Sequence, residues 1–194
     1  MTYLSLIPDI LNMRKISTFT SLFLLIINFT GYAQTHIKGN CVYWMLGMPN
    51  VSVETKVAEH LTLSGEIFYS PWESVNDNPL KFLQFNPDIR WYPKGAFHGF
   101  YAGAYASVQD FKLSKWNYWN TNSYQKGWGY GFGALWGYQV LLSDRWALDV
   151  YAGAGWHHGR YRGYYKNTGK MSVDWNGSGE WLPYRLGIVV CYRL

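Results

Sequence analysis

Nine ionisable side chains occupy positions that would face the inside of a barrel, if the chain forms strands whose side chains alternate between two faces. They are Lys38, Glu54, Lys56, Glu66, Asp88, Arg90, Asp149, Arg185 and Arg193. An unpaired charge in such an interior costs on the order of several kcal/mol, so five basic and four acidic groups should pair. We therefore expect a structural interior charge cluster and a plugged lumen. The cluster residues are Lys38, Glu54, Glu66, Asp88, Arg90, Asp149 and Arg185. A gated proton or ion path through the same charges is the alternative.

Two adjacent histidines, His157 and His158, are the candidates for acid–base chemistry. We expect them at the external rim near Asp149, where a barrel enzyme that modifies lipid A or lipoproteins would hold its histidine. Such a site needs a nucleophile within hydrogen-bond reach of the base, and no motif supplies one. Strand neighbours point to opposite faces, which disfavours a shared metal. The sequence thus predicts no catalytic, cofactor-binding or metal-binding residue, with the enzyme as the alternative reading.

Basic and aromatic residues gather in two segments predicted to be external loops, 112–126 and 160–180. The candidate contact residues are Lys115, Trp116, Trp119, Arg160 and Arg162. Cations beside flat rings suit lipopolysaccharide phosphates, glycans or an acidic protein surface. An exported barrel would rarely meet nucleic acid, so no nucleic-acid partner is expected. A solvated rim with interfacial tryptophans and tyrosines is the simpler alternative.

Cys41 and Cys191 fall on the first and last predicted strands, which become neighbours when a barrel closes. A disulfide across that seam suits an oxidising periplasm. Parity opposes it, because Cys191 is expected to point inward and Cys41 outward.

The elements that position these residues are strands with an unusual alternation. From Trp128 to Val140 one parity carries Trp, Tyr, Phe, Ala and Val, whereas the other is mostly glycine, interrupted by Leu135. A soluble sandwich or lipocalin-like barrel, the alternative fold, would turn its apolar face inward and a polar face to water. A small transmembrane barrel does the reverse, with apolar side chains toward lipid and small or polar ones in the lumen.

The same alternation predicts eight strands, at 36–47, 50–58, 61–69, 81–92, 98–111, 127–141, 146–159 and 181–194. Short connections alternate with long ones, as periplasmic turns and external loops do in outer-membrane barrels. Pro87 lies inside a predicted strand, where it removes a ladder donor, so we expect a bulge there.

The first 33 residues resemble a cleavable export signal. Met13, Arg14 and Lys15 form a basic start, residues 19–29 form an apolar core, and Gly31 and Ala33 are the small residues before a cleavage site. We expect translation to begin at Met13 and cleavage to precede Gln34, leaving a barrel domain at 34–194.

Several short motifs carry a family resemblance over residues 37–194. They are Met48-Pro49-Asn50, His60-Leu61-Thr62-Leu63, Tyr69-Ser70-Pro71-Trp72, Asn86-Pro87-Asp88-Ile89-Arg90-Trp91-Tyr92, Trp136-Gly137-Tyr138-Gln139 and Leu142-Ser143-Asp144-Arg145-Trp146. In this order they resemble a domain-of-unknown-function family of small Gram-negative outer-membrane barrels. The resemblance implies an eight-stranded barrel without established activity, and relatives that sometimes occur beside surface fimbrial systems.

Together these features predict an all-β protein, an eight-stranded antiparallel up-and-down transmembrane barrel in the outer membrane of a Gram-negative bacterium, with periplasmic termini. We expect a non-enzymatic structural or surface-interaction role through the external loops, with a lipid-modifying enzyme or a narrow channel as alternatives. The expected partners are outer-membrane lipids and lipopolysaccharide, the outer-membrane assembly machinery and a surface or fimbrial protein.

Overall fold

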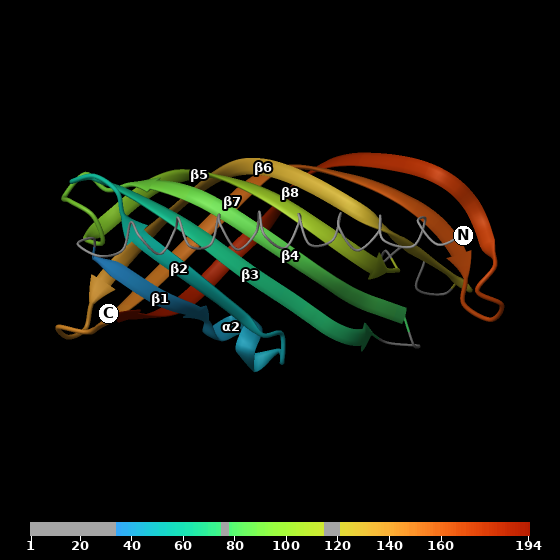
Figure 1. The fold of residues 1–194 in the computed structure, drawn as a ribbon, viewed down its shortest axis with the longest axis horizontal. Helices are drawn as coiled ribbons and strands as arrows, with labels where there is room; N and C mark the ends of the chain where they lie inside the picture. The colour runs from blue at the N-terminus through green and yellow to red at the C-terminus, as the bar shows by residue number, and fades with distance from the viewer. Residues whose placement is uncertain (1–33, 75–77, 115–120) are drawn as a thin grey trace, which may run out of the picture. The chain divides into compact units, whose positions relative to one another are not determined.

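Eight antiparallel strands follow one another around a closed barrel in the order in which they occur along the chain (Figure 1). The structure is a computed structural model, and it describes residues 34–74, 78–114 and 121–194. The elements are β1 (Thr35–Asn40), α2 (Cys41–Met45), β2 (Asn50–Lys56), β3 (Leu61–Ser74), β4 (Asn78–Trp91), β5 (Gly99–Leu113), β6 (Ser123–Leu141), β7 (Trp146–Tyr165) and β8 (Met171–Arg193). The predicted all-β, up-and-down barrel of eight strands is confirmed.

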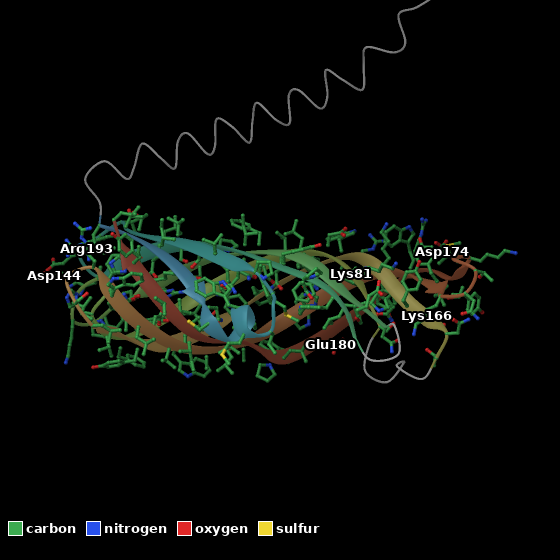
Figure 2. The ribbon with its side chains drawn as sticks, turned by 90° about the horizontal axis from the view of Figure 1, so that it is seen from below. Lys81, Asp144, Lys166, Asp174, Glu180 and Arg193 are labelled. Atoms are coloured by element: carbon green, nitrogen blue, oxygen red, sulfur yellow. The ribbon has the colours of Figure 1, made fainter. Side chains whose placement is uncertain are left out.

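The barrel closes through pairing of its first and last strands, from His36 opposite Arg193 to Asn40 opposite Val189. We call the end where β1 begins and β8 ends the terminal end, and the opposite end the distal end. The connections at 57–60, 92–98 and 142–145 lie at the terminal end. In Figure 2, Asp144 and Arg193 mark the terminal end and Asp174 marks the distal end.

The strands differ from their predicted lengths in a systematic way. β6, β7 and β8 have 19, 20 and 23 residues, far more than the ~10 that a tilted bilayer crossing needs. Most of the segments predicted as loops at 70–80, 112–126 and 160–180 are therefore strand, apart from 75–77 and 115–120, which lie outside the described residues. Conversely, β1 and β2 are short, so the distal wall continues in β3 to β8 alone.

The predicted first strand, 36–47, is wrong beyond Asn40, because the chain turns into α2. The Asn40 side chain accepts a hydrogen bond from the backbone N–H of Val42 at 3.1 Å, as an N-cap does. Asn50 fixes the same corner by accepting from the Asn40 N–H at 2.7 Å. After the helix, Gly47 has φ of +65°, a backbone conformation that glycine adopts without steric cost. Cys41 thus begins a helix instead of lying on a strand.

The bulge expected at Pro87 is also wrong. β4 and β5 keep one register on both sides of it, with Phe85 opposite Val108 and Asp88 opposite Tyr105. Proline has no N–H to donate to the ladder, and the β4–β5 pairing simply skips two residue pairs at this point. No extra residue is inserted in either strand. Irregularities occur instead between β7 and β8, on either side of residue 154 and around Gly163.

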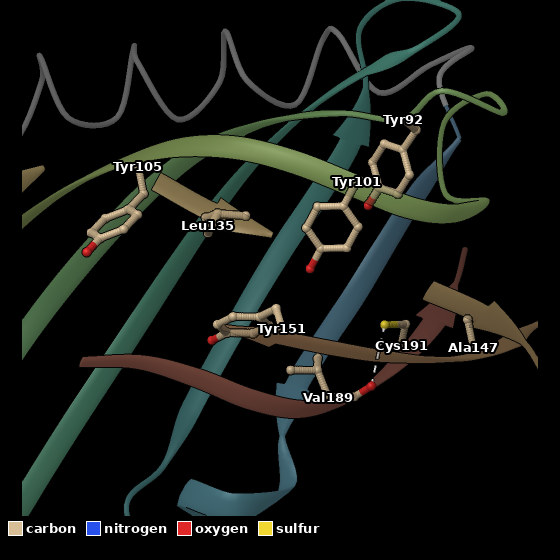
Figure 3. Close-up of a cluster of buried hydrophobic side chains, with 8 residues drawn as sticks. All are labelled: Tyr92, Tyr101, Tyr105, Leu135, Ala147, Tyr151, Val189 and Cys191. Carbon is tan, nitrogen blue, oxygen red and sulfur yellow. Dashed lines mark hydrogen bonds between the residues drawn. The ribbon is translucent and has the colours of Figure 1, made fainter. Parts of the chain in front are cut away.

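The two faces of the wall have opposite chemistry. Large apolar side chains such as Phe132, Leu186 and Ile188 point outward and are 55, 60 and 47 % exposed. The interior holds charged and amide side chains together with a cluster of eight buried residues (Figure 3). These are Tyr92, Tyr101, Tyr105, Leu135, Ala147, Tyr151, Val189 and Cys191. Among the described residues no helix is long and apolar enough to span a membrane.

Candidate functional site

The seven ionisable residues predicted for the interior lie together inside the barrel, and we call them the lumen cluster. They are Lys38, Glu54, Glu66, Asp88, Arg90, Asp149 and Arg185, and none is more than 6 % exposed. They come from six strands, β1, β2, β3, β4, β7 and β8. Strand alternation aims each one inward, and closure of the barrel brings first and last strands together around them.

Asp149 connects its own strand, β7, to β1, β4 and β5. One of its oxygens, Oδ2, accepts from Lys38 Nζ at 3.0 Å and from Arg90 Nη1 at 2.8 Å. Its other oxygen, Oδ1, accepts from the Tyr101 hydroxyl at 2.7 Å. Both carboxylate oxygens are therefore satisfied, and hydrogen bonds to charged groups are the stronger class of such bonds.

Glu54 has a second set of partners, hydrogen bonds at one oxygen and ion pairs at the other. Its Oε1 accepts from the Thr62 hydroxyl at 2.5 Å and from the Tyr92 hydroxyl at 2.9 Å. Its Oε2 forms ion pairs with Lys38 and with Arg90 Nη1, the latter at 3.2 Å. Lys38 thus pairs with two carboxylates and Arg90 with three, which offsets the cost of burying these cations.

Arg185 extends the cluster toward the distal end. Its Nη1 lies 3.4 Å from Glu66 Oε2 and its Nη2 lies 3.5 Å from Asp88 Oδ2. Asp88 also accepts from Arg90 Nε at 2.7 Å, so the two arginines share one carboxylate. The Arg185 guanidinium lies 5.1 Å from the centre of the Tyr105 ring, within the range of a cation–π contact.

The other two predicted inward cations do not join the cluster. Lys56 is only half-buried and Arg193 is exposed at the terminal end, because both lie where their strands leave the barrel. The five basic and four acidic groups expected to face inward thus reduce to seven in the cluster, which remains nearly balanced in charge. Three cations face four carboxylates, an excess of one negative charge.

Little space remains between these side chains. The cavity bordered by Lys38, Glu66, Arg90 and Arg185 has a volume of about 10 Å³. A cavity of that size holds at most one water molecule. The lumen beside the cluster is thus packed, as a barrel of eight strands generally is.

A turn closes the terminal end of the lumen. Phe97, in the connection between β4 and β5, is fully buried and stacks on the His36 ring at 3.9 Å between centroids. Its φ of +69° is uncommon for a residue with a side chain. We did not predict this closure, and an aromatic residue in a five-residue turn after Pro93 is the only sequence signal for it.

Four interior tyrosines were also missed as members of the site. Tyr101 and Tyr105 have the parity opposite to outward-facing Phe100 and Val108, and this offset is the signal that marks them as interior. Glycine makes room for them. A Cβ on Gly133 or Gly155 would lie 2.7 Å from the Tyr105 hydroxyl oxygen, closer than real Cβ contacts come.

The structure separates the two candidate histidines. The His157 ring lies over the buried Gly129, where a Cβ would come within 2.9 Å of it, so it faces the interior. His158 faces outward and stacks on Trp156 at 5.5 Å. Asp149 lies eight residues away on β7, roughly 26 Å at ~3.3 Å per residue, so the expected neighbourhood of His157, His158 and Asp149 is wrong. No group of three or more metal-ligating side chains occurs among the described residues.

Of the predicted external contact residues, Arg160 and Arg162 lie on β7 and not in a loop. Both guanidinium groups lie over the Trp175 ring, at 5.6 and 4.6 Å from its centre. Lys115, Trp116 and Trp119 fall outside the described residues. A cavity of about 150 Å³ lies nearby at the distal end, and its lining is uncharged. The lining residues are Ser114, Ser123, Tyr124, Gln125, Tyr161, Gly163, Ser172, Val173 and Asn176.

Both cysteines are free thiols. Cys191 is buried in the lumen, as its parity predicts, and its thiol lies 3.8 Å from the Val189 carbonyl oxygen (Figure 3). Cys41 is half-buried at the start of α2. The seam disulfide is therefore not formed in this structure.

Comparison with known proteins gives one family match. A family model described as "Protein of unknown function (DUF3575)" matches residues 18–194. Neither the curated proteins nor the solved structures include a match.

Proposed function

The chain belongs to the DUF3575 family of proteins of unknown function, and from that premise we propose that it is a non-enzymatic outer-membrane barrel protein with a structural or surface-interaction role. In this proposal the terminal end faces the periplasm, the plugged lumen is structural, and the distal end meets envelope lipids or a partner protein.

One observation carries the proposal, the inversion of apolar and charged side chains. Leu186 and Phe132 are more than half exposed on the outer wall, whereas Glu54 and Asp149 are fully buried. Water would penalise both arrangements, because it favours covered apolar patches and solvated carboxylates. A lipid environment around the wall removes the first penalty, and ion pairing inside the lumen offsets the second.

The packed lumen supports a structural role over transport. The lumen cluster leaves room for about one water molecule, and Phe97 closes the terminal end. His157 faces the interior and His158 faces outward, so the two histidines do not form a pair that could serve an enzyme at the rim. The distal end, where β6, β7 and β8 extend furthest, is then the part left for contacts.

Gel mobility and fractionation test the proposal. Folded outer-membrane barrels resist mild detergent, so we expect the unheated full chain to migrate faster than the boiled chain. We also expect it in the outer-membrane fraction of a Gram-negative host. Equal mobility together with recovery from the soluble periplasm would contradict the proposal and favour a soluble barrel.

A further inference from the structure

Four cations form one continuous row across adjacent strands near the distal end. Lys112 on β5 lies opposite Lys81 on β4 and Lys126 on β6, and Lys126 lies opposite Arg162 on β7. We call these four residues the cation row. Strands lie about 4.8 Å apart, so the row spans roughly 15 Å.

The cation row faces outward, just beyond the apolar band of the wall. On β6 the row residue Lys126 lies two residues before the exposed Trp128, and on β4 Lys81 lies two residues before the exposed Leu83, in both cases toward the distal end. On β5 the row residue Lys112 lies on the same face of the strand as the exposed Val108. β4 and β6 therefore change directly from apolar to cationic outward residues at this level, whereas on β5 Asp110 and on β7 Arg160 lie one outward position closer to the apolar band.

The middle of the row has less counter-charge than its ends: within the described residues neither Lys112 nor Lys126 makes an ion pair, although the Glu73 carboxylate also interacts electrostatically with Lys112. At its ends, Lys81 pairs with Glu73 at 2.7 Å and Arg162 with Asp174 at 3.1 Å. Lys126 is exposed and makes no ion pair within the described part of the chain, and Lys112 lies over the Tyr124 ring at 4.6 Å. Directly opposed like charges destabilise a sheet, so an anion that bridges Lys112 and Lys126 would be stabilising.

Neither Glu73 nor Asp110 forms an ion pair with Lys112 or Lys126 within the described part of the chain, since Glu73 pairs with Lys81. Asp110 is the outward acidic residue one step closer to the band, opposite Leu83 and Trp128. It forms no ion pair in the part of the chain that the structure describes. Lys112 and Lys126 thus keep a net positive charge, which Glu73 offsets only in part.

We infer that the cation row is a binding site for the phosphorylated headgroup of an outer-leaflet glycolipid. The apolar band beneath the row suits the acyl chains, and Lys112 and Lys126 suit the phosphates, which lysine binds as a point charge. The inference rests on the proposed function, because it needs the outer wall to lie in the outer membrane. It adds a defined site and a ligand chemistry to that proposal.

The test uses the full chain purified from membranes of a Gram-negative host and titrated with diphosphorylated lipid A in neutral detergent micelles. Native mass spectrometry reports the bound lipid. A cation near an anionic membrane surface contributes about 1 kcal/mol, or roughly fivefold in affinity. We therefore expect Lys112→Gln/Lys126→Gln to weaken binding by ~25-fold, and raised salt to weaken binding of the natural chain.

Lys94→Gln/Lys170→Gln is the matched control, since it removes two exposed lysines outside the row. It should bind as the natural chain does. Equal affinity of the two double variants would overturn the inference, as would equal binding of a dephosphorylated lipid A. Complete displacement of the lipid by millimolar inorganic phosphate would overturn it too, in favour of a general anion site.

Gel mobility of each variant separates lost folding from lost binding. If Lys112→Gln/Lys126→Gln does not fold, the single variant Lys126→Gln takes its place in the titration. We expect this variant to bind diphosphorylated lipid A about fivefold more weakly than the natural chain does. Failure of the natural chain to reach the outer membrane would overturn the proposed function and the site together. If the natural chain reaches the outer membrane but the row variants bind lipid A as tightly as it does, only the proposed site would be overturned.

Discussion

At the scale of single residues, Asp149 is the carboxylate on which the lumen cluster depends most directly. It accepts hydrogen bonds from Lys38, Arg90 and Tyr101, and its removal would leave two buried cations with fewer counter-charges. Breaking a buried ion pair costs about 3–5 kcal/mol. We expect Asp149→Asn to lower the free energy of unfolding by that amount, measured by denaturant titration in detergent micelles.

The matched control for Asp149 is Asp174→Asn. Asp174 pairs with Arg162 but is 70 % exposed, and surface ion pairs contribute at most about 1 kcal/mol. Similar losses in the two variants would contradict a structural role for the lumen cluster.

Two glycines on β7 give a second comparison at this scale. A Cβ at Gly155 would come within 2.2 Å of the Phe132 carbonyl oxygen and 2.7 Å of the Tyr105 hydroxyl, whereas at Gly159 the nearest atom is 3.5 Å away. Overpacking costs about 1–3 kcal/mol. We expect Gly155→Ala to lower the unfolding free energy by that much and Gly159→Ala to leave it nearly unchanged in the same titration. The reverse order would show that Tyr105 does not pack against this wall.

At the scale of elements, the turn between β4 and β5 is predicted to stabilise the terminal end. Phe97 is fully buried despite its positive φ, so its contact with His36 must outweigh the strain. Truncating a buried phenylalanine costs about 3–5 kcal/mol. We expect Phe97→Ala to lower the temperature at which the fast-migrating band is lost, whereas Lys94→Ala, in the same turn but exposed, should not. An unchanged temperature for Phe97→Ala would mean that the turn does not close the lumen.

Strand parity was predictable from sequence because outward-facing wall residues are large and apolar, whereas inward-facing ones are small, polar or charged. This rule placed Leu135 and the seven lumen-cluster residues on the inner face before the barrel was seen. Strand ends were less predictable, because polar residues continue the ladder beyond the apolar band. The short helix α2 depends on the Asn40 N-cap before it and on Gly47 after it, and side-chain alternation does not reveal such local features.

Contacts between distant strands were beyond sequence reasoning for a different reason. Parity gives the face of a residue but not its height in the barrel, which depends on register. His157 and Asp149 face the same side of the wall but lie at different heights in the barrel, so their expected proximity was wrong. The cation row is seen only once the strand registers place Lys81, Lys112 and Lys126 opposite one another.

At the scale of the whole molecule, the packed lumen predicts that the barrel does not conduct ions. The cavity beside the lumen cluster is about 10 Å³, and Phe97 lies across the terminal end, so no continuous water path is expected. The full chain inserted in planar bilayers should therefore give no unitary current steps. Reproducible steps from the natural chain would contradict the plugged lumen and favour the narrow-channel alternative.

A paired truncation gives the positive counterpart of that experiment. Glu54→Ala/Arg90→Ala removes one negative and one positive side chain that contact each other at 3.2 Å, so the net charge of the lumen is unchanged while space is opened. Lys38 keeps Asp149 as its partner, and Asp88 keeps Arg185. We expect this variant, combined with Phe97→Ala to open the terminal end and shown to be folded by a heat-dependent gel shift, to conduct small ions. Conduction by the variant and silence of the natural chain would attribute the seal to these side chains. Silence of both would assign the seal to the interior tyrosines instead.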